Sequence, residues 1–136
     1  MRFQFVIAAV AGLIMTSASQ AQQLNDTSWE PVSLDGTDFT PLQETFVQFD
    51  QEGRFFGKDG CNSIRGRFVT NGDAILFGPA AATMMACPQE VMDQAQAYTK
   101  ALMAARLYTL EGDDMTLLDA DGKELVRLQK RDGELR

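Results

Sequence analysis

The chain has 136 residues, 45% of them hydrophobic, with a net charge of −7 at pH 7, two cysteines and no histidine. The absence of histidine excludes Ser-His-Asp and Cys-His catalysis and removes the commonest zinc ligand. The acidic balance disfavours nucleic acid and anionic membranes as partners, so we expect no nucleic-acid partner.

The first 21 residues are predicted to be a signal peptide rather than part of the fold. Arg2 provides a short positive start, residues 3–15 are almost wholly apolar, and Ser19-x-Ala21 fits a small-x-small cleavage site. An uncleaved anchor is the alternative, but the apolar run is shorter than the ~20 residues of a comfortable membrane span. No cysteine lies near the cleavage site to carry a lipid. We therefore expect an exported, soluble protein, periplasmic or secreted, that is not a lipoprotein.

The mature part, residues 22–136, is predicted to be a single monomeric domain with no transmembrane segment. Its length allows one hydrophobic core with little room to spare. The ordered part is expected over about residues 24–130, with a charged and frayed tail from Gln129 onward.

The first half of this domain is predicted to be built of strands. Trp29 is the large apolar residue of the first strand. Residues 34–41 have the composition of a loop, and Asn71-Gly72 is the strongest hairpin signal in the chain. The segment Gly57-Lys58-Asp59-Gly60 is interpreted as a turn rather than a phosphate-binding loop. The predicted strands cover residues 27–34, 45–49, 54–57, 63–70 and 74–77.

The second half begins with a predicted helix over about residues 88–106. Pro88 suits the first helical position, and one helical face carries an apolar stripe made of Val91, Ala95, Tyr98, Leu102 and Ala105. Three further strands are predicted over residues 107–110, 115–118 and 124–128.

This order predicts an α+β fold in which about eight antiparallel strands form a strongly curved sheet or partly open barrel. Strands that follow one another through tight turns pair antiparallel. A single amphipathic helix cannot cover both faces of a flat sheet, so the sheet must curve around the helix that packs against it.

No residue is assigned a catalytic, cofactor-binding or metal-binding role from the sequence. Asp119-x-Asp121-Gly122 resembles the start of a calcium loop, but the later ligands are missing and a hairpin turn is preferred. Arg65 and Arg67 share one strand face, which is interpreted as solvated rather than as an anion site. A hydrolase using Asp or Glu is the weakest alternative, because no pair of carboxylates stands out.

Apolar residues outside the helix leave two questions open. Met84 and Met85 precede the helix; one is expected in the core, and the other is left open. Five phenylalanines either fill the core, which is preferred, or line a cavity for a small apolar ligand: Phe46, Phe49, Phe55, Phe68 and Phe77.

The two cysteines, Cys61 and Cys87, are predicted to form a structural disulfide. Export implies an oxidising compartment, and no histidine or second metal-ligand pair accompanies the cysteines. The alternative is a reactive Cys87, since a helix N-terminus lowers the pKa of a thiol. In the favoured interpretation Gly60 supplies a strained turn conformation, and Asn62 bonds to the local main chain.

Two motifs at this spacing resemble the META domain, the family of the HslJ-like heat-shock proteins. They are Gly57-x-x-Gly60-Cys61-Asn62 and Thr83-x-Met85-Ala86-Cys87-Pro88 before a helix, accompanied by Trp29, Gly66, Tyr108 and a closing Leu117-Leu118 hairpin. The sequence departs from the family at Phe68, where tyrosine is frequent, so a hydrogen bond from that hydroxyl is absent. The resemblance implies a small exported α+β domain of bacteria, linked in some members to heat stress and antibiotic tolerance, with no established enzymatic activity.

These observations predict a non-catalytic domain of the bacterial cell envelope, without a cofactor, that has a stress-related role. It is expected to bind a partner, either a protein or a small envelope component. A carrier of small apolar ligands is the alternative.

Overall fold

The structure is a computed structural model that describes residue 12 and residues 24–131. Apart from residue 12, the predicted signal peptide lies outside the described residues, as do the last five residues of the tail.

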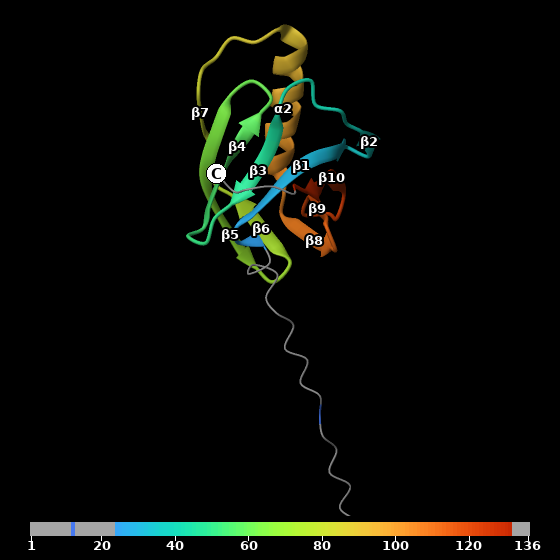
Figure 1. Cartoon of the computed structure of the whole chain (residues 1–136). Helices are drawn as coiled ribbons and strands as arrows, with labels where there is room; N and C mark the ends of the chain where they lie inside the picture. The colour runs from blue at the N-terminus through green and yellow to red at the C-terminus, as the bar shows by residue number, and fades with distance from the viewer. Residues whose placement is uncertain (1–11, 13–23, 132–136) are drawn as a thin grey trace, which may run out of the picture.

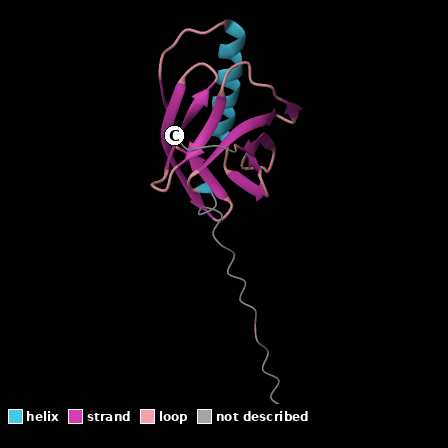
Figure 2. Ribbon diagram, in the orientation of Figure 1, coloured by secondary structure: helices cyan, strands magenta, loops and turns pink. Residues whose placement is uncertain are grey.

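Ten strands and one long helix, α2 (Gln89–Ala104), make up the described domain (Figure 2). Alternation of apolar and polar residues buries every second side chain in most strands. The strands are β1 (Thr27–Leu34), β2 (Thr37–Asp38), β3 (Thr45–Phe49), β4 (Arg54–Asp59), β5 (Ser63–Asn71), β6 (Ala74–Phe77), β7 (Ala81–Ala82), β8 (Leu107–Glu111), β9 (Asp114–Leu118) and β10 (Glu124–Lys130).

Eight of the strands close into an antiparallel barrel in the order β1-β3-β4-β5-β6-β8-β9-β10 (Figure 1). The barrel closes where β1 pairs with β10, from Trp29 opposite Lys130 to Leu34 opposite Val126. Strands β2 and β7 are short additions that pair with β1 and β5. The predicted curved antiparallel sheet with one helix is therefore confirmed, and the described barrel is closed rather than partly open.

Helix α2 packs against the barrel, and its buried face joins the same hydrophobic cluster as the strand side chains. Four of the five predicted stripe residues are buried within the helix, and Ala105, also buried, follows its last residue. Pro88 caps the helix from the position before its first residue rather than occupying that residue. The helical period of apolar residues thus located the packing face correctly.

Three local predictions from the sequence are wrong, and one short strand was not predicted. Strand β2 lies within the predicted loop, and β7 was not predicted at all. Residues 57–59 continue β4 instead of forming a turn, because Gly57 pairs with both Val47 and Ile64. The tail is ordered through Arg131, whose backbone N–H donates to the Ser28 carbonyl at 2.7 Å.

The buried face of α2 gives a prediction about alkaline pH. The Tyr98 hydroxyl is fully buried without a hydrogen-bond partner among the described residues. Burial, and secondarily the Asp59 carboxylate, raise the pKa of Tyr98 above its ordinary value of 10.0. The folded protein thus favours the neutral phenol. The contribution of Tyr98 to the free energy of unfolding is therefore fully present below the pKa of tyrosine in the unfolded chain. This contribution is lost as the pH rises from that value towards the higher pKa of the folded state.

We expect Tyr98→Phe to leave the free energy of unfolding within about 1 kcal/mol of wild type at neutral pH, because no partner loses a hydrogen bond. Above pH ~10 the wild type should lose stability more steeply than the variant. Urea unfolding across this range checks both statements. Burial also raises the pKa of Tyr108, so the double phenylalanine variant should have a still shallower slope. Identical slopes in all three proteins would contradict this account.

Candidate functional site

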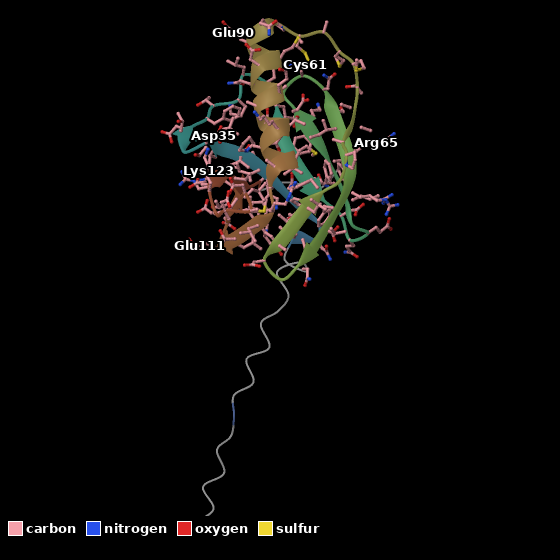
Figure 3. The ribbon with its side chains drawn as sticks, turned by 180° about the vertical axis from the view of Figure 1, so that it is seen from behind. Asp35, Cys61, Arg65, Glu90, Glu111 and Lys123 are labelled. Carbon is pink, nitrogen blue, oxygen red and sulfur yellow. A yellow bond between two sulfur atoms is a disulfide. The ribbon has the colours of Figure 1, made fainter. Side chains whose placement is uncertain are left out.

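The two sequence motifs meet at one end of the barrel, where a disulfide joins Cys61 to Cys87 with their Cα atoms 5.9 Å apart. Cys61 lies in the turn between β4 and β5, and Cys87 lies two residues before α2. Figure 3 shows Cys61 beside the upper part of this helix. The predicted crosslink is confirmed, and the alternative of a reactive Cys87 thiol is excluded in the oxidised chain.

The turn before the disulfide is organised by Asp59, a residue to which the sequence analysis gave no role. Asp59 is buried, and its Oδ1 accepts the backbone N–H groups of Cys61 at 2.8 Å and Asn62 at 2.6 Å. Gly60 has a φ of +101°, a conformation that side chains other than glycine rarely adopt. In the sequence, the signal for this turn is the pair Asp59-Gly60, because Asp and Gly are frequent turn residues.

Asn62 connects the turn to the segment that precedes α2, which we call the crossover segment (residues 83–88). Its Oδ1 accepts hydrogen bonds from the Thr83 hydroxyl at 2.9 Å and from the Met85 backbone N–H at 2.7 Å. The Thr83 hydroxyl in turn accepts the Ser63 N–H at 3.1 Å. The expectation that Asn62 bonds to its local main chain is therefore wrong, since its partners lie more than twenty residues away in sequence.

The remaining motif residues have packing roles or lie at the surface. Trp29 is buried and donates from its indole N–H to the Thr27 hydroxyl at 2.7 Å. At Gly66, a Cβ atom would lie 2.8 Å from the Phe55 ring. Ala86 is exposed in the crossover segment. The motif residues Trp29 and Gly66 thus contribute to packing, while Ala86 lies at the surface.

Met84 and Met85 are both exposed, at 96% and 62% of their surface. The prediction that one of them packs into the core is wrong. The hydrogen bond to Asn62 and the disulfide hold the crossover segment against the β4–β5 turn, which leaves these side chains directed outward.

A second feature is a groove of about 1080 Å³ on the outside of the barrel, over β3, β4 and β5. The strand register places Phe46 opposite Lys58, Gln48 opposite Phe56, and Phe56 opposite Arg65. These side chains alternate with buried neighbours and therefore point away from the core. We call this the outer groove; its main side chains are Glu44, Phe46, Gln48, Phe56, Lys58, Arg65 and Arg131.

Three cations and one carboxylate set the charge of the outer groove. The carboxylate of Glu44 accepts a contact from Lys58 Nζ at 3.3 Å on one oxygen and from Arg131 Nη2 at 3.1 Å on the other. The hydrogen bond from Lys58 is the largest of the effects that hold the pKa of Glu44 below its ordinary value. Arg65 forms no ion pair with a described residue. The groove therefore has a local excess of positive charge on an acidic protein.

The five phenylalanines divide between the core and the outer groove. Phe49, Phe55, Phe68 and Phe77 are buried, and edge-on contacts join Phe49 to Phe68 and Phe55 to Phe77. The preferred core interpretation is correct for these four. It is wrong for Phe46, whose ring faces outward with the Arg131 guanidinium 4.3 Å from its centroid, a cation–π geometry.

The other polar candidates from the sequence lie in the positions expected of surface residues. Asp119 Oδ1 accepts the N–H groups of Asp121 and Lys123, which confirms a turn. Arg65 and Arg67 are both exposed, but of these two only Arg65 lines the groove. Within residues 24–131, no three His, Cys, Asp or Glu side chains gather as a metal site requires.

No described helix is long and apolar enough to cross a bilayer.

The outer groove was not predicted from the sequence, because it depends on the register of three strands and on Arg131, a residue after the last strand. The available signal was the outward set of alternating residues on β3 and β4, where aromatic and basic side chains interleave.

Three solved structures share this fold. An NMR structure of a protein from Burkholderia xenovorans has a TM-score of 0.66 at 23% identity, over 83% of this chain and 87% of its own. A second NMR structure has a TM-score of 0.64 at 18% identity, over 80% of this chain and 92% of its own. A crystal structure of a DUF4847 family protein from Bacteroides vulgatus has a TM-score of 0.65 at 12% identity, over 85% of this chain and 100% of its own.

At these identities the likeness concerns the fold alone. No curated protein matches the chain. At the level of families, the META domain matches residues 22–132, which is most of the sequence and includes both motifs. The chain therefore belongs to the META domain family.

Proposed function

We propose that this META domain is an exported, non-catalytic component of the bacterial cell envelope that binds a partner through the outer groove. The observation that carries the proposal is the groove itself, which is lined by two half-buried aromatic side chains and three cations on one sheet face. Aromatic and arginine side chains are the residues that dominate binding energy at protein interfaces. The pattern of the first 21 residues supports export.

The ion pairs of the carboxylate in the groove favour a binding role over catalysis. Glu44 is the one carboxylate among the described residues that line it, and both of its oxygens contact a cation. A glycosidase-type mechanism uses a pair of carboxyl groups, one of which acts as the protonated general acid. The four buried phenylalanines likewise favour a packed interior over a carrier of apolar ligands.

We assign the domain a role in tolerance of heat or antibiotics, on the basis of what membership of the META family implies. A strain that lacks the protein should then grow less well under one of these stresses, and the wild-type gene should restore growth.

Site-specific photo-crosslinking tests the groove as the binding surface. A photoreactive residue at Gln48, at the centre of the groove, should form a discrete adduct in the envelope of the native host. The matched control is Thr109, an exposed strand residue on β8 outside the groove. Adducts from Thr109 but not Gln48, or from neither position under stress and non-stress conditions, would contradict the proposed binding surface.

A further inference from the structure

The outer groove also indicates which class of ligand it takes. We infer that its occupant is an acidic polypeptide segment, with carboxylate side chains that contact Lys58, Arg65 and Arg131 and apolar side chains that lie against Phe46 and Phe56. This inference rests on the proposed function, because it concerns the same groove.

Charge is the first argument. The groove contains three cations against one carboxylate, whereas the whole chain carries a net charge of −7. An acidic protein repels anions at long range, so it disfavours polyanions such as nucleic acid and anionic bilayers. A short segment with a few carboxylates can still form local charge pairs, because exposed charges more than about 10 Å apart are largely screened.

The second argument is that the groove already accommodates a protein carboxylate. The Glu44 side chain bridges Lys58 and Arg131, with one oxygen on each. Glu44 is about half exposed in this arrangement, so the bridge lies open to solvent and to competition. A glutamate or aspartate of a partner can replace it at the same two cations.

Arg65 provides a cation that Glu44 does not neutralise. It lies opposite Phe56 on the neighbouring strand, so a charge and an aromatic ring are presented side by side. Cross-strand neighbours directly opposite each other are about 5 Å apart, and side chains on one face of an extended peptide repeat every two residues. An extended segment matches this pattern when acidic and aromatic residues take turns at every second position, so that both kinds lie on the face that meets the groove.

The shape of the groove favours a polypeptide over a compact anion. Its volume of about 1080 Å³ lies just above the ~300–1,000 Å³ of typical small-molecule pockets. It extends over three adjacent strands, and its lining includes the small side chains of Ala81 and Ala82 of β7 as well as Arg131.

Fluorescence anisotropy tests the inference with a labelled peptide that repeats Glu-Ser-Phe-Ser, in which glutamate and phenylalanine share one face of the extended chain. A matched peptide carries glutamine in place of each glutamate. The glutamate peptide should bind, and its affinity should fall as salt increases. Lys58→Glu/Arg65→Glu should weaken binding by roughly tenfold or more, since two charge pairs become repulsive.

The matched control is Lys123→Glu/Arg127→Glu, which makes the same change of net charge at exposed positions outside the groove. Figure 3 shows Lys123 and Arg65 on opposite sides of the molecule. The control should bind the peptide within a factor of about two of wild type, because neither residue lines the groove and the contribution of exposed charges weakens with distance. If the double groove variant fails to fold, as judged by circular dichroism, Arg65→Glu alone replaces it.

Three results would overturn the inference: no binding of the glutamate peptide, equal binding of the glutamine peptide, or equal losses in the groove and control variants. Equal binding of single-stranded DNA or of phosphatidylglycerol vesicles would show general anion attraction and would also overturn it. An adduct at Gln48 without peptide binding leaves the proposed function standing and rejects only the acidic ligand. Peptide binding in the absence of any adduct at Gln48 rejects the proposed function instead.

Discussion

Replacement of Gly57 by alanine is expected to destabilise the domain by about 3 kcal/mol or more, at the upper end of overpacking substitutions. Gly57 lies in β4 between β3 and β5. A Cβ atom at this position would overlap the carbonyl oxygen of Phe46, lie 2.9 Å from its carbonyl carbon and approach the Val47 Cα to 3.1 Å. Every atom in these contacts belongs to the backbone, so no side-chain rotation can relieve the overlap.

Guanidinium unfolding of the oxidised protein measures this effect. Lys58→Ala is the matched control, because it places the same alanine side chain in the same strand at an exposed position and removes only a solvent-exposed ion pair with Glu44. We expect the control to cost less than about 1 kcal/mol. If Gly57→Ala unfolds at the same denaturant concentration as the control, then β3 and β4 are farther apart than the structure places them.

Removal of the disulfide by Cys61→Ser/Cys87→Ser is expected to lower the free energy of unfolding by about 3.5 kcal/mol on the chain-entropy model. The crosslink joins residues 26 apart, and the double variant frees this loop in the unfolded chain. The same change also releases the crossover segment, which then depends on the bonds of Asn62 and Thr83.

Wild type in reductant is the control for the serine variant, since both lack the crosslink. The two should unfold at similar denaturant concentrations, and both should unfold well below the oxidised wild type. Intact mass after alkylation without reduction reports whether the protein made by its own host carries the bond. A serine variant as stable as oxidised wild type would show that the loop is already constrained in the unfolded chain.

The fold was predictable because its signals are local. The alternation of apolar residues located β1, β3 and β6 at their observed bounds, and the helical period located the buried face of α2. The pairing of the cysteines followed from their number and from the absence of other partners. Closure of the barrel was less predictable, because it depends on a contact between the first and last strands rather than on any local pattern.

The candidate site was less predictable for the same reason. Phe46 looks like a core residue in the sequence, and only its register in β3 shows that it faces outward. Arg131 was assigned to a frayed tail, yet its contacts with Ser28, Glu44 and Phe46 order it. Short strands such as β7 carry too few residues for periodicity to show.

The pairing of β1 with β10 also constrains the order of events during synthesis. These strands lie at opposite ends of the domain, from Thr27 to Lys130, so the edge of β1 that pairs with β10 stays unpaired until the last strand has emerged. A nascent chain can form the hairpins of β3 to β6 early, because their contacts are local. The pairing of β1 with β10 closes a long loop, and the entropy cost of this closure arises only at the end of synthesis. Until that moment, the edge of β1 that later pairs with β10 is an open template for another chain. Because the chain is synthesised from its N-terminus, β1 can mispair with another chain until about a hundred further residues have been made.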